Sequence, residues 1–221
     1  MAAPSDSVCC LVRGQSSAYD GAARFLFEFD PEFERGASMA SILIFCALLF
    51  QASSQSAPKP AIENDRVVVW DGRDSAPVQP LDAVIVFLSG DAIFVPKGTT
   101  SKITGRFIVI NLKDHPVPPM ANTSGYPLAF PRPGVKKLVE NDRVIVWDYT
   151  WTPEVPTPMH FHDKDVVVFF LEDGDLKSTT PDGQAVVNAY TSSTVRFNAR
   201  NRTHSETLVR GKQRAIITEL K

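Results

Sequence analysis

Three histidines in the last third of the chain are the residues best suited to chemistry. His160 and His162 stand two residues apart in the segment Thr157-Pro-Met-His-Phe-His162, and His204 follows in a later segment. On a β-strand, side chains two residues apart project to the same face, with their Cα atoms ~6.6 Å apart. Two imidazoles at this separation can be bridged by one metal ion. The spacing therefore predicts a divalent-metal site on His160, His162 and His204, with nearest ring nitrogens ~3–4.5 Å apart.

A carboxylate could complete this site. Glu206 lies two residues beyond His204, so in a regular strand it shares the inward face, whereas a one-residue bulge would turn it outward. Asp165 is the other candidate, but its counterpart Asp82 occurs in a segment without the histidines, and a role at a strand start explains both aspartates. We favour a site that stays open with three histidine ligands.

The histidines must be positioned by strands. Short runs of Val, Ile, Phe and Trp alternate with turn residues, and no long segment has helical periodicity, so the fold class is all-β. Eight strands are expected in the second half, near residues 143–149, 155–161, 166–171, 174–179, 185–190, 193–197, 205–210 and 213–220. Eight strands of this kind predict a jelly-roll β-barrel.

An internal repeat organises these strands. Ile62–Asp71 returns as Val139–Asp148 with eight of ten residues identical, and Asp82–Asp91 resembles Asp165–Asp175. The pattern predicts a truncated repeat at 62–113, with five or six strands and without the His-x-His segment.

The repeat divides the chain into parts with different expected roles. Residues 62–113 should be metal-free, with a barrel interior filled by residues such as Val84, Val86 and Ile108. Residues 114–138 read as a Pro-rich connector. Residues 139–221 should form the barrel that carries the candidate metal site.

The histidine segments resemble the motifs of the cupin superfamily. The first motif, Gly-x5-His-x-His followed by a Glu and a Gly, is matched by His160, His162 and Gly174, but its first Gly is Glu154 here. Its Glu falls on Val167, or on Val166 at the shorter spacing. The second motif, Gly-x5-Pro-x-Gly-x2-His-x3-Asn, keeps only His204; its other positions are Ser193, Ala199, Asn201 and Leu208. Asn201 can still form the turn, since Asn tolerates a left-handed backbone.

The resemblance implies a small β-barrel that holds Fe, Mn, Zn, Ni or Cu on three histidines and a glutamate, in proteins that act as enzymes or as ligand-binding proteins. The fold alone selects neither role. Because only neutral histidine ligates, metal affinity should decline below pH ~6.5.

Composition excludes several other classes. The 221 residues contain 23 Lys plus Arg and 25 Asp plus Glu, so a nucleic-acid partner is not indicated. The three cysteines, Cys9, Cys10 and Cys46, precede the expected folded part, so thiolate ligands are excluded there. Arg196, Arg200 and Arg202 precede His204; an anion-attracting role and a solvated loop both stay open.

The N-terminal segment reads as a targeting signal. Residues 42–50 form a nine-residue apolar run, followed by small and polar residues, which is typical of a signal peptide. Met39 is then the expected translation start, and residues 1–57 precede the mature protein. This interpretation predicts a secreted or periplasmic protein, free of the membrane after processing; a membrane anchor at 42–50 is the alternative.

Two functional hypotheses follow. The first is a secreted cupin-like protein with a divalent transition metal and a small organic molecule as ligand. The alternative is a non-catalytic barrel, binding or structural, without metal. A homodimer stays open under both.

Overall fold

The structure, a computed structural model, describes residues 59–73, 79–100 and 102–221. The predicted signal peptide, with its apolar run at 42–50, lies outside the described residues. No helix in the described part of the chain is long and apolar enough to cross a membrane.

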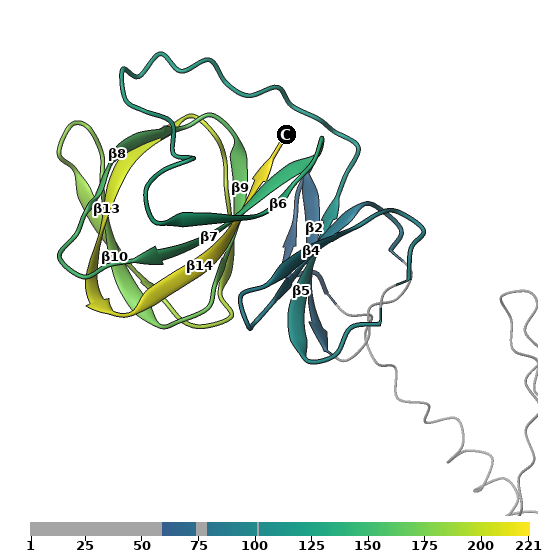
Figure 1. The fold of residues 1–221 in the computed structure, drawn as a ribbon. Coiled ribbons are helices and arrows are strands. Elements are labelled where there is room, and N and C mark those ends of the chain that lie inside the picture. The colour runs from purple at the N-terminus through teal and green to yellow at the C-terminus, as the bar shows by residue number, and fades with distance from the viewer. Residues whose placement is uncertain (1–58, 74–78, 101) are drawn as a thin grey trace, which may run out of the picture. The chain divides into compact units, whose positions relative to one another are not determined.

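The second half is an all-β jelly-roll sandwich, which confirms the predicted fold class (Figure 1). Two sheets face each other without closing into a continuous barrel. One has the order β12-β9-β14-β7-β6 and the other β11-β10-β13-β8. The strands are β6 (Val135–Glu140), β7 (Val144–Trp151), β8 (Thr157–His162), β9 (Asp165–Phe170), β10 (Gly174–Thr179), β11 (Ala185–Tyr190), β12 (Val195–Asn198), β13 (Arg202–Gly211) and β14 (Gln213–Leu220). All eight predicted strands are present, and β6 begins inside the stretch expected to be a connector.

The first half forms one sheet with the order β1-β2-β5-β3-β4. Its strands are β1 (Ile62–Glu63), β2 (Val67–Arg73), β3 (Ala83–Phe87), β4 (Ala92–Val95) and β5 (Arg106–Leu112). The expected barrel interior of this half is wrong, because a single sheet encloses nothing. Val84, Val86 and Ile108 are buried, but in a core shared with residues of the second half.

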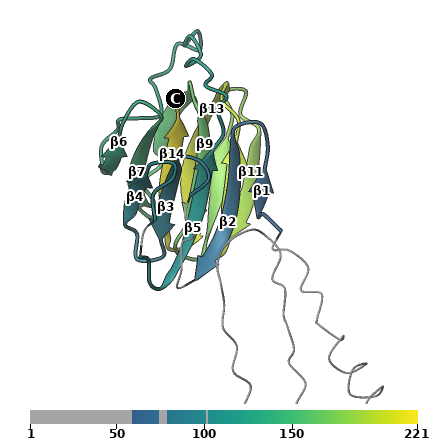
Figure 2. The ribbon, with the colours of Figure 1, turned by 90° about the vertical axis from the view of Figure 1, so that its right-hand side faces the viewer.

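The β12-β9-β14-β7-β6 sheet is buried on both faces. Val167 and Phe169 of β9 pack in the core shared with the first half, whereas Val166 and Val168 pack in the interior of the sandwich. All six residues of β9 are buried, which explains its uninterrupted apolar sequence. Figure 2 shows β2, β3 and β5 lying over β7, β14 and β9. The first half therefore acts as a cover for the sandwich.

The strand orders of the two five-stranded sheets correspond to one another. The repeat predicted from the sequence matches β1 with β6, β2 with β7, β3 with β9 and β5 with β14, and each pair takes the same place in its sheet; the remaining places are taken by β4 and β12. The first half has no second sheet in its described residues, and it is the second sheet of the sandwich that carries β8 and β13.

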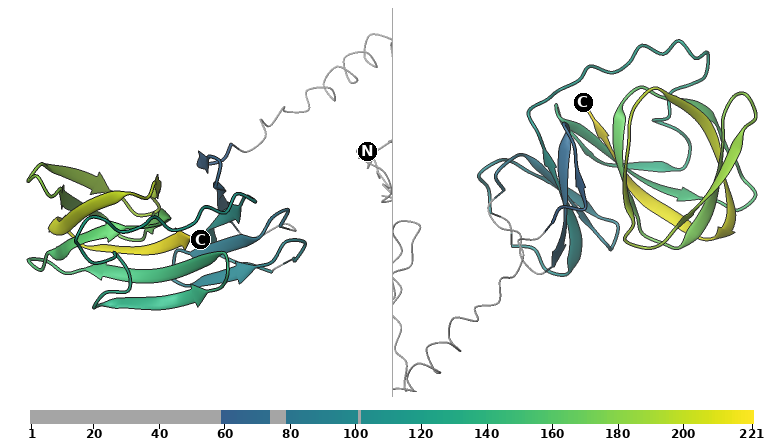
Figure 3. Two further views of the ribbon diagram at one scale, coloured as in Figure 1. Left: turned by 90° about the horizontal axis from the view of Figure 1, so that it is seen from above. Right: turned by 180° about the vertical axis from the view of Figure 1, so that it is seen from behind.

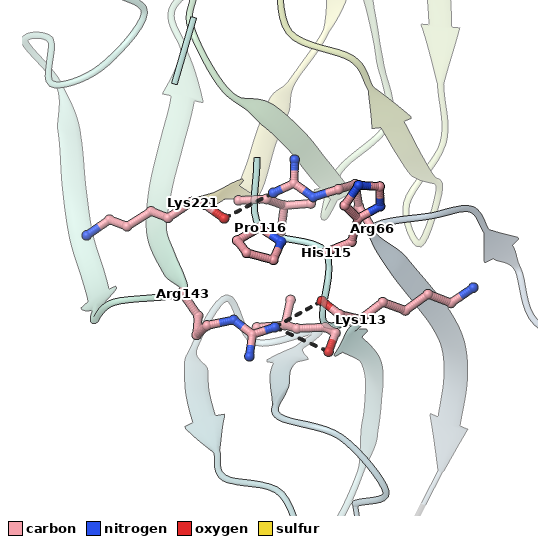
Figure 4. A pocket seen from close by; sticks show the side chains of 8 residues that line it. Arg66, Lys113, His115, Pro116, Arg143 and Lys221 are labelled. Atoms are coloured by element: carbon pink, nitrogen blue, oxygen red, sulfur yellow. Dashed lines mark hydrogen bonds between the residues drawn. The ribbon is translucent and has the colours of Figure 1, made fainter. Parts of the chain in front are cut away.

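Two arginines at matched positions tie the halves together. Arg66 donates to the Asp165 carboxylate and to the carbonyl of Lys221, and Arg143 donates to Asp82 at 3.0 Å and to the carbonyl of Lys113 at 3.0 Å. The contacts with Lys221 and Lys113 are drawn in Figure 4. In Figure 3 the C-terminal end of β14 reaches toward the first half, where Arg66 meets it.

These contacts give each aspartate a structural role. Asp165 also accepts from the backbone N–H of Arg200, and Asp82 from that of Lys97. Each carboxylate therefore accepts a hydrogen bond from a backbone N–H and pairs with an arginine of the other half. Asp165 is not a candidate metal ligand.

We expect Arg66→Ala to lower the free energy of unfolding by about 3–5 kcal/mol, because it leaves the buried Asp165 carboxylate without its counter-charge. Arg106, which pairs with Asp71 at the surface, is the control: Arg106→Ala should cost at most about 1 kcal/mol. Urea unfolding of both variants measures the difference. Equal losses would mean that the buried pair adds nothing beyond a surface pair.

Candidate metal centre

Two neighbouring strands hold the three histidines. β8 and β13 pair in antiparallel fashion, with His204 opposite His160 and Arg202 opposite His162. Residues opposite one another in such a pair share a face, so all four side chains point into the sandwich. The histidines are 3%, 7% and 9% exposed for His160, His162 and His204.

The ring nitrogens of the three histidines converge. The Nε2 atom of His162 lies 3.2 Å from Nε2 of His160 and 3.1 Å from Nε2 of His204. One ligand atom from each residue lies within 4.8 Å of the other two. The separations suit metal–nitrogen bonds of about 2.0–2.1 Å, as expected from the sequence.

A neighbouring carbonyl sets the tautomer of one histidine. Nδ1 of His160 lies 2.7 Å from the carbonyl of Pro158, which can only accept, so this nitrogen carries the proton and Nε2 carries a lone pair. Nδ1 of His204 lies 3.2 Å from the hydroxyl of Ser178, and Nδ1 of His162 is buried with no partner. With the proton on each Nδ1, three Nε2 lone pairs point at one another across 3.1–3.2 Å, where a cation can bind all of them. The donor set therefore fits a metal ion.

Burial keeps these histidines neutral. It is the main cause that lowers the pKa of His160 and of His204 to about 4, and the pKa of His162 well below its usual 6.5. The positive charges of Arg132 and Arg202 add to the effect at His160 and His204 respectively. The decline in metal affinity that the sequence placed below pH ~6.5 should consequently begin at a lower pH.

Glu206 points into the same interior. The pairing of β8 with β13 shifts between His204 and Glu206, but the extra residue is on β8, so Glu206 keeps the parity of His204. Its Oε1 atom lies 4.0 Å from Nε2 of His204, and its Oε2 accepts a hydrogen bond of 3.0 Å from the indole N–H of Trp151. Glu206 is thus next to the three nitrogens and oriented by a neighbour.

The position of the usual cupin-motif glutamate is apolar here. Val166, not Val167, lines the interior beside the histidines, whereas Val167 faces the core shared with the first half. Val167 therefore does not face the histidines, although the spacing that ends at Gly174 places the motif glutamate there. No side chain of β9 supplies a ligand, which leaves Glu206 as the carboxylate beside the histidines.

A segment of the expected connector also reaches the site. Leu128 bridges to Phe161, and the backbone of Ala129 donates to the carbonyl of Phe161 at 2.8 Å, so this segment runs beside β8. It places Arg132 over the rings of Phe130 and Tyr149, with Nη1 3.4 Å from Nε2 of His160. Sequence reasoning missed Arg132, since nothing in a Pro-rich stretch signals pairing with a distant strand.

The site opens into a cavity of about 160 Å³. The β7, β9 and β14 strands contribute mostly apolar side chains to its walls, whereas β10, β11, β12 and β13 contribute mostly polar ones. The lining includes Phe130, Arg132, Trp151, Val166, Val168, Phe170, Ser178, Asn188, Tyr190, Arg196, Arg202, Glu206 and Ile217. The sequence predicted Arg196 and Arg202 only as members of an arginine cluster. Each lies two residues from another cavity-lining residue, Asn198 or His204, and this spacing could have indicated that both face the interior. Arg200 instead donates to the carbonyl of Pro118, and His115 is an exposed loop residue.

The backbone is left-handed at three positions where the cupin motifs have glycine. Glu154, Ser193 and Asn201 have φ angles of 62°, 72° and 64°, and they are the only non-glycine residues with positive φ in the described part of the chain. Each stands where a motif has Gly. The retained Gly174 has a different constraint, since a Cβ there would lie 2.5 Å from the carbonyl oxygen of Lys212.

Similarity to known proteins is found among solved structures. No family model and no curated protein matches the sequence. Among solved structures, the chain is similar to a cupin domain from Bordetella pertussis at 26% identity, covering 41% of this chain and 97% of that one, with a TM-score of 0.37. A cupin 2 conserved barrel domain protein from Leptotrichia buccalis matches at 11% identity over 80% of this chain and 94% of that one, with a TM-score of 0.44. The polyketide cyclase RemF from Streptomyces resistomycificus matches at 19% identity over 47% and 79%, with a TM-score of 0.34.

The chain has a jelly-roll sandwich whose histidine motifs resemble those of the cupin superfamily. The strand order of the sandwich and the left-handed backbone at the motif positions carry this assignment on the structure itself. In this cupin sandwich the three histidines occupy the interior, on the sheet opposite the first half of the chain.

The low histidine pKa values predict a pH-dependent stability for the metal-free cupin. The unfolded chain protonates its histidines near pH 6.5, whereas His160 and His204 do so in the fold only near pH 4. The free energy of unfolding should be highest above pH 6.5 and fall between pH 6.5 and about 4, by up to about 1.4 kcal/mol per pH unit and histidine. Urea midpoints at pH 7.5 and 5.0 test this. A triple His→Gln variant should lose most of this slope, and an unchanged slope would contradict the assignment.

Restoring motif glycines should stabilise the protein. A left-handed backbone costs a non-glycine residue about 1–2 kcal/mol, so Glu154→Gly and Ser193→Gly should each raise the free energy of unfolding by about 1 kcal/mol. Asn201→Gly should change it less, because Asn tolerates this conformation. Ala199→Gly, at a residue without positive φ, should instead cost about 0.4–1 kcal/mol. Thermal unfolding separates the two classes, and a loss at Ser193 would refute the argument.

Proposed function

We propose that the protein is a secreted or periplasmic cupin-like protein that binds one divalent transition metal on His160, His162 and His204 and receives a small organic molecule in the adjoining cavity. The observation that carries the proposal is the convergence of three Nε2 atoms, with separations of 3.1 and 3.2 Å. Export rests on the apolar run at 42–50 and its small-residue tail.

The donor set indicates which ions fit. Three neutral imidazoles suit Fe, Mn, Zn, Ni or Cu and leave positions for other ligands. Bound there, the ion would supply Lewis-acid or redox chemistry to a molecule in the cavity. The protein's own part is to hold the rings through Pro158 and Ser178, to place Glu206 beside them, and to line one side of the cavity with apolar residues of β9 and β14.

The first half has a supporting role in this proposal. We infer that residues 62–113 are a repeat of the sandwich that has kept the packing sheet and lost the sheet with the histidines. Its matched strand order and the paired contacts of Arg66 and Arg143 support this origin.

One observation favours the alternative of a binding barrel without metal. Nη1 of Arg132 lies 3.4 Å from Nε2 of His160 and competes for the lone pair that a metal needs. The balance between the two depends on whether the ion displaces this contact.

Elemental analysis of protein produced without a His-tag decides between them. We expect about one transition-metal ion per chain, lost in His160→Gln, His162→Gln and His204→Gln, while His115→Gln keeps it. Metal retained by all three variants, or absent from the wild type after reconstitution with Zn²⁺ and Fe²⁺, would rule out the proposed centre.

Glu206→Gln measures the role of the carboxylate. For an open three-histidine site, Zn²⁺ affinity should change by less than about tenfold, since the amide keeps the shape and Oε1 lies 4.0 Å from Nε2 of His204. Affinity lost by orders of magnitude would instead make Glu206 the fourth ligand.

A further inference from the structure

Three arginines of the cavity differ from most of the others in their partners. Arg66, Arg143 and Arg214 each pair with an aspartate of the described chain. In contrast, the cavity-lining arginines form no ion pair with any described carboxylate; they are Arg132, Arg196 and Arg202. Arg132 and Arg202 are only partly exposed.

Contacts within the protein orient the guanidinium groups of Arg132 and Arg202 but leave some of their N–H donors without an acceptor. Arg132 lies over the rings of Phe130 and Tyr149, at 4.8 and 4.1 Å from their centroids, and its Nε atom is buried without a hydrogen-bond partner. Arg202 donates through Nε to the carbonyl of Ala199 at 2.7 Å, and no described residue accepts from its terminal nitrogens. Both side chains are oriented and retain free donors.

The charge around the histidines is therefore unbalanced. Glu206 is the carboxylate of the cavity lining, and Trp151 already occupies one of its oxygens. Three arginines against one carboxylate leave an excess of positive charge that is partly removed from water, and a bound divalent ion would add to this excess. The missing element is a negative charge from outside the protein.

We propose that the cavity binds a small organic carboxylate whose anionic group pairs with Arg132 and Arg202. A carboxylate matches the planar fork of a guanidinium, and its organic part would lie against Val168, Phe170 and Ile217. The volume of about 160 Å³ is many times the ~10–15 Å³ that one water needs, which suits a small molecule. This names the ligand class of the proposed metal-binding protein and rests on that function for its biological meaning.

Calorimetric titration of the Zn²⁺-reconstituted protein with benzoate and its neutral analogue benzamide tests the proposal. Benzoate should bind roughly ten- to a hundredfold more tightly, and Arg202→Met should remove this preference while the zinc content stays unchanged. Arg210→Met, at an arginine that pairs with Asp175 on the surface, should leave it intact. Arg202→Lys keeps the positive charge but not the planar fork of the guanidinium, so it should weaken benzoate binding partially. It also serves as the control in case the Met variant misfolds.

The outcomes separate the two proposals. Equal binding of benzoate and benzamide, no binding of either, or a preference that survives Arg202→Met overturns the carboxylate site even if zinc binds. Tighter binding of orthophosphate than of benzoate also overturns it. An arginine-dependent preference for benzoate in protein that holds no zinc supports the carboxylate site and defeats the metal centre alone.

Discussion

The antiparallel register of β8 and β13 is the constraint on which the whole site depends. With His204 opposite His160 and Arg202 opposite His162, one pairing brings three imidazoles and a guanidinium to the same face. A slip by one residue would turn His204 outward and bring Thr203 and Ser205 into the interior. The extra residue between the paired segments lies on β8, which bends that strand and leaves the parity of β13 intact through Glu206. The register of the backbone pairing thus determines which side chains face the interior together.

The sheet opposite the site explains why the first half of the chain exists. Val144, Val146, Val167, Phe169 and Ile216 form an apolar face that points away from the cavity, and each such side chain left in water would forfeit about 1.5–3 kcal/mol. The sheet of β1 to β5 covers that face, and Arg66 and Arg143 fasten its end. A covering sheet needs no ligands of its own, which is consistent with the absence of histidine from residues 62–113. A homodimer, which the sequence leaves open, would have to use another surface.

Period-two spacing made most of this structure predictable. The strands, the jelly-roll class and the convergence of His160 with His162 all follow from side chains that alternate in runs bounded by turn residues. Alternation gave no help on β9, where both faces are buried and Val166 cannot be told from Val167. Nor could composition reveal that the segment before Arg132 pairs with β8, because that contact joins residues with no common pattern. The single-sheet architecture of the described first half was likewise hidden, since a shorter repeat in sequence does not say which strands pair.

The positive charge of the cavity connects its two proposed ligands. Arg132 and Arg202 help keep the histidines neutral by lowering the pKa of His160 and His204, and neutral rings keep their lone pairs available. The same positive charges repel a metal cation, and the negative charge of Glu206 partly offsets this repulsion. An anion seated on the arginines would relieve that repulsion, and by thermodynamic linkage the metal would strengthen anion binding to the same extent. A site of this composition therefore favours the metal and a carboxylate together over either one alone.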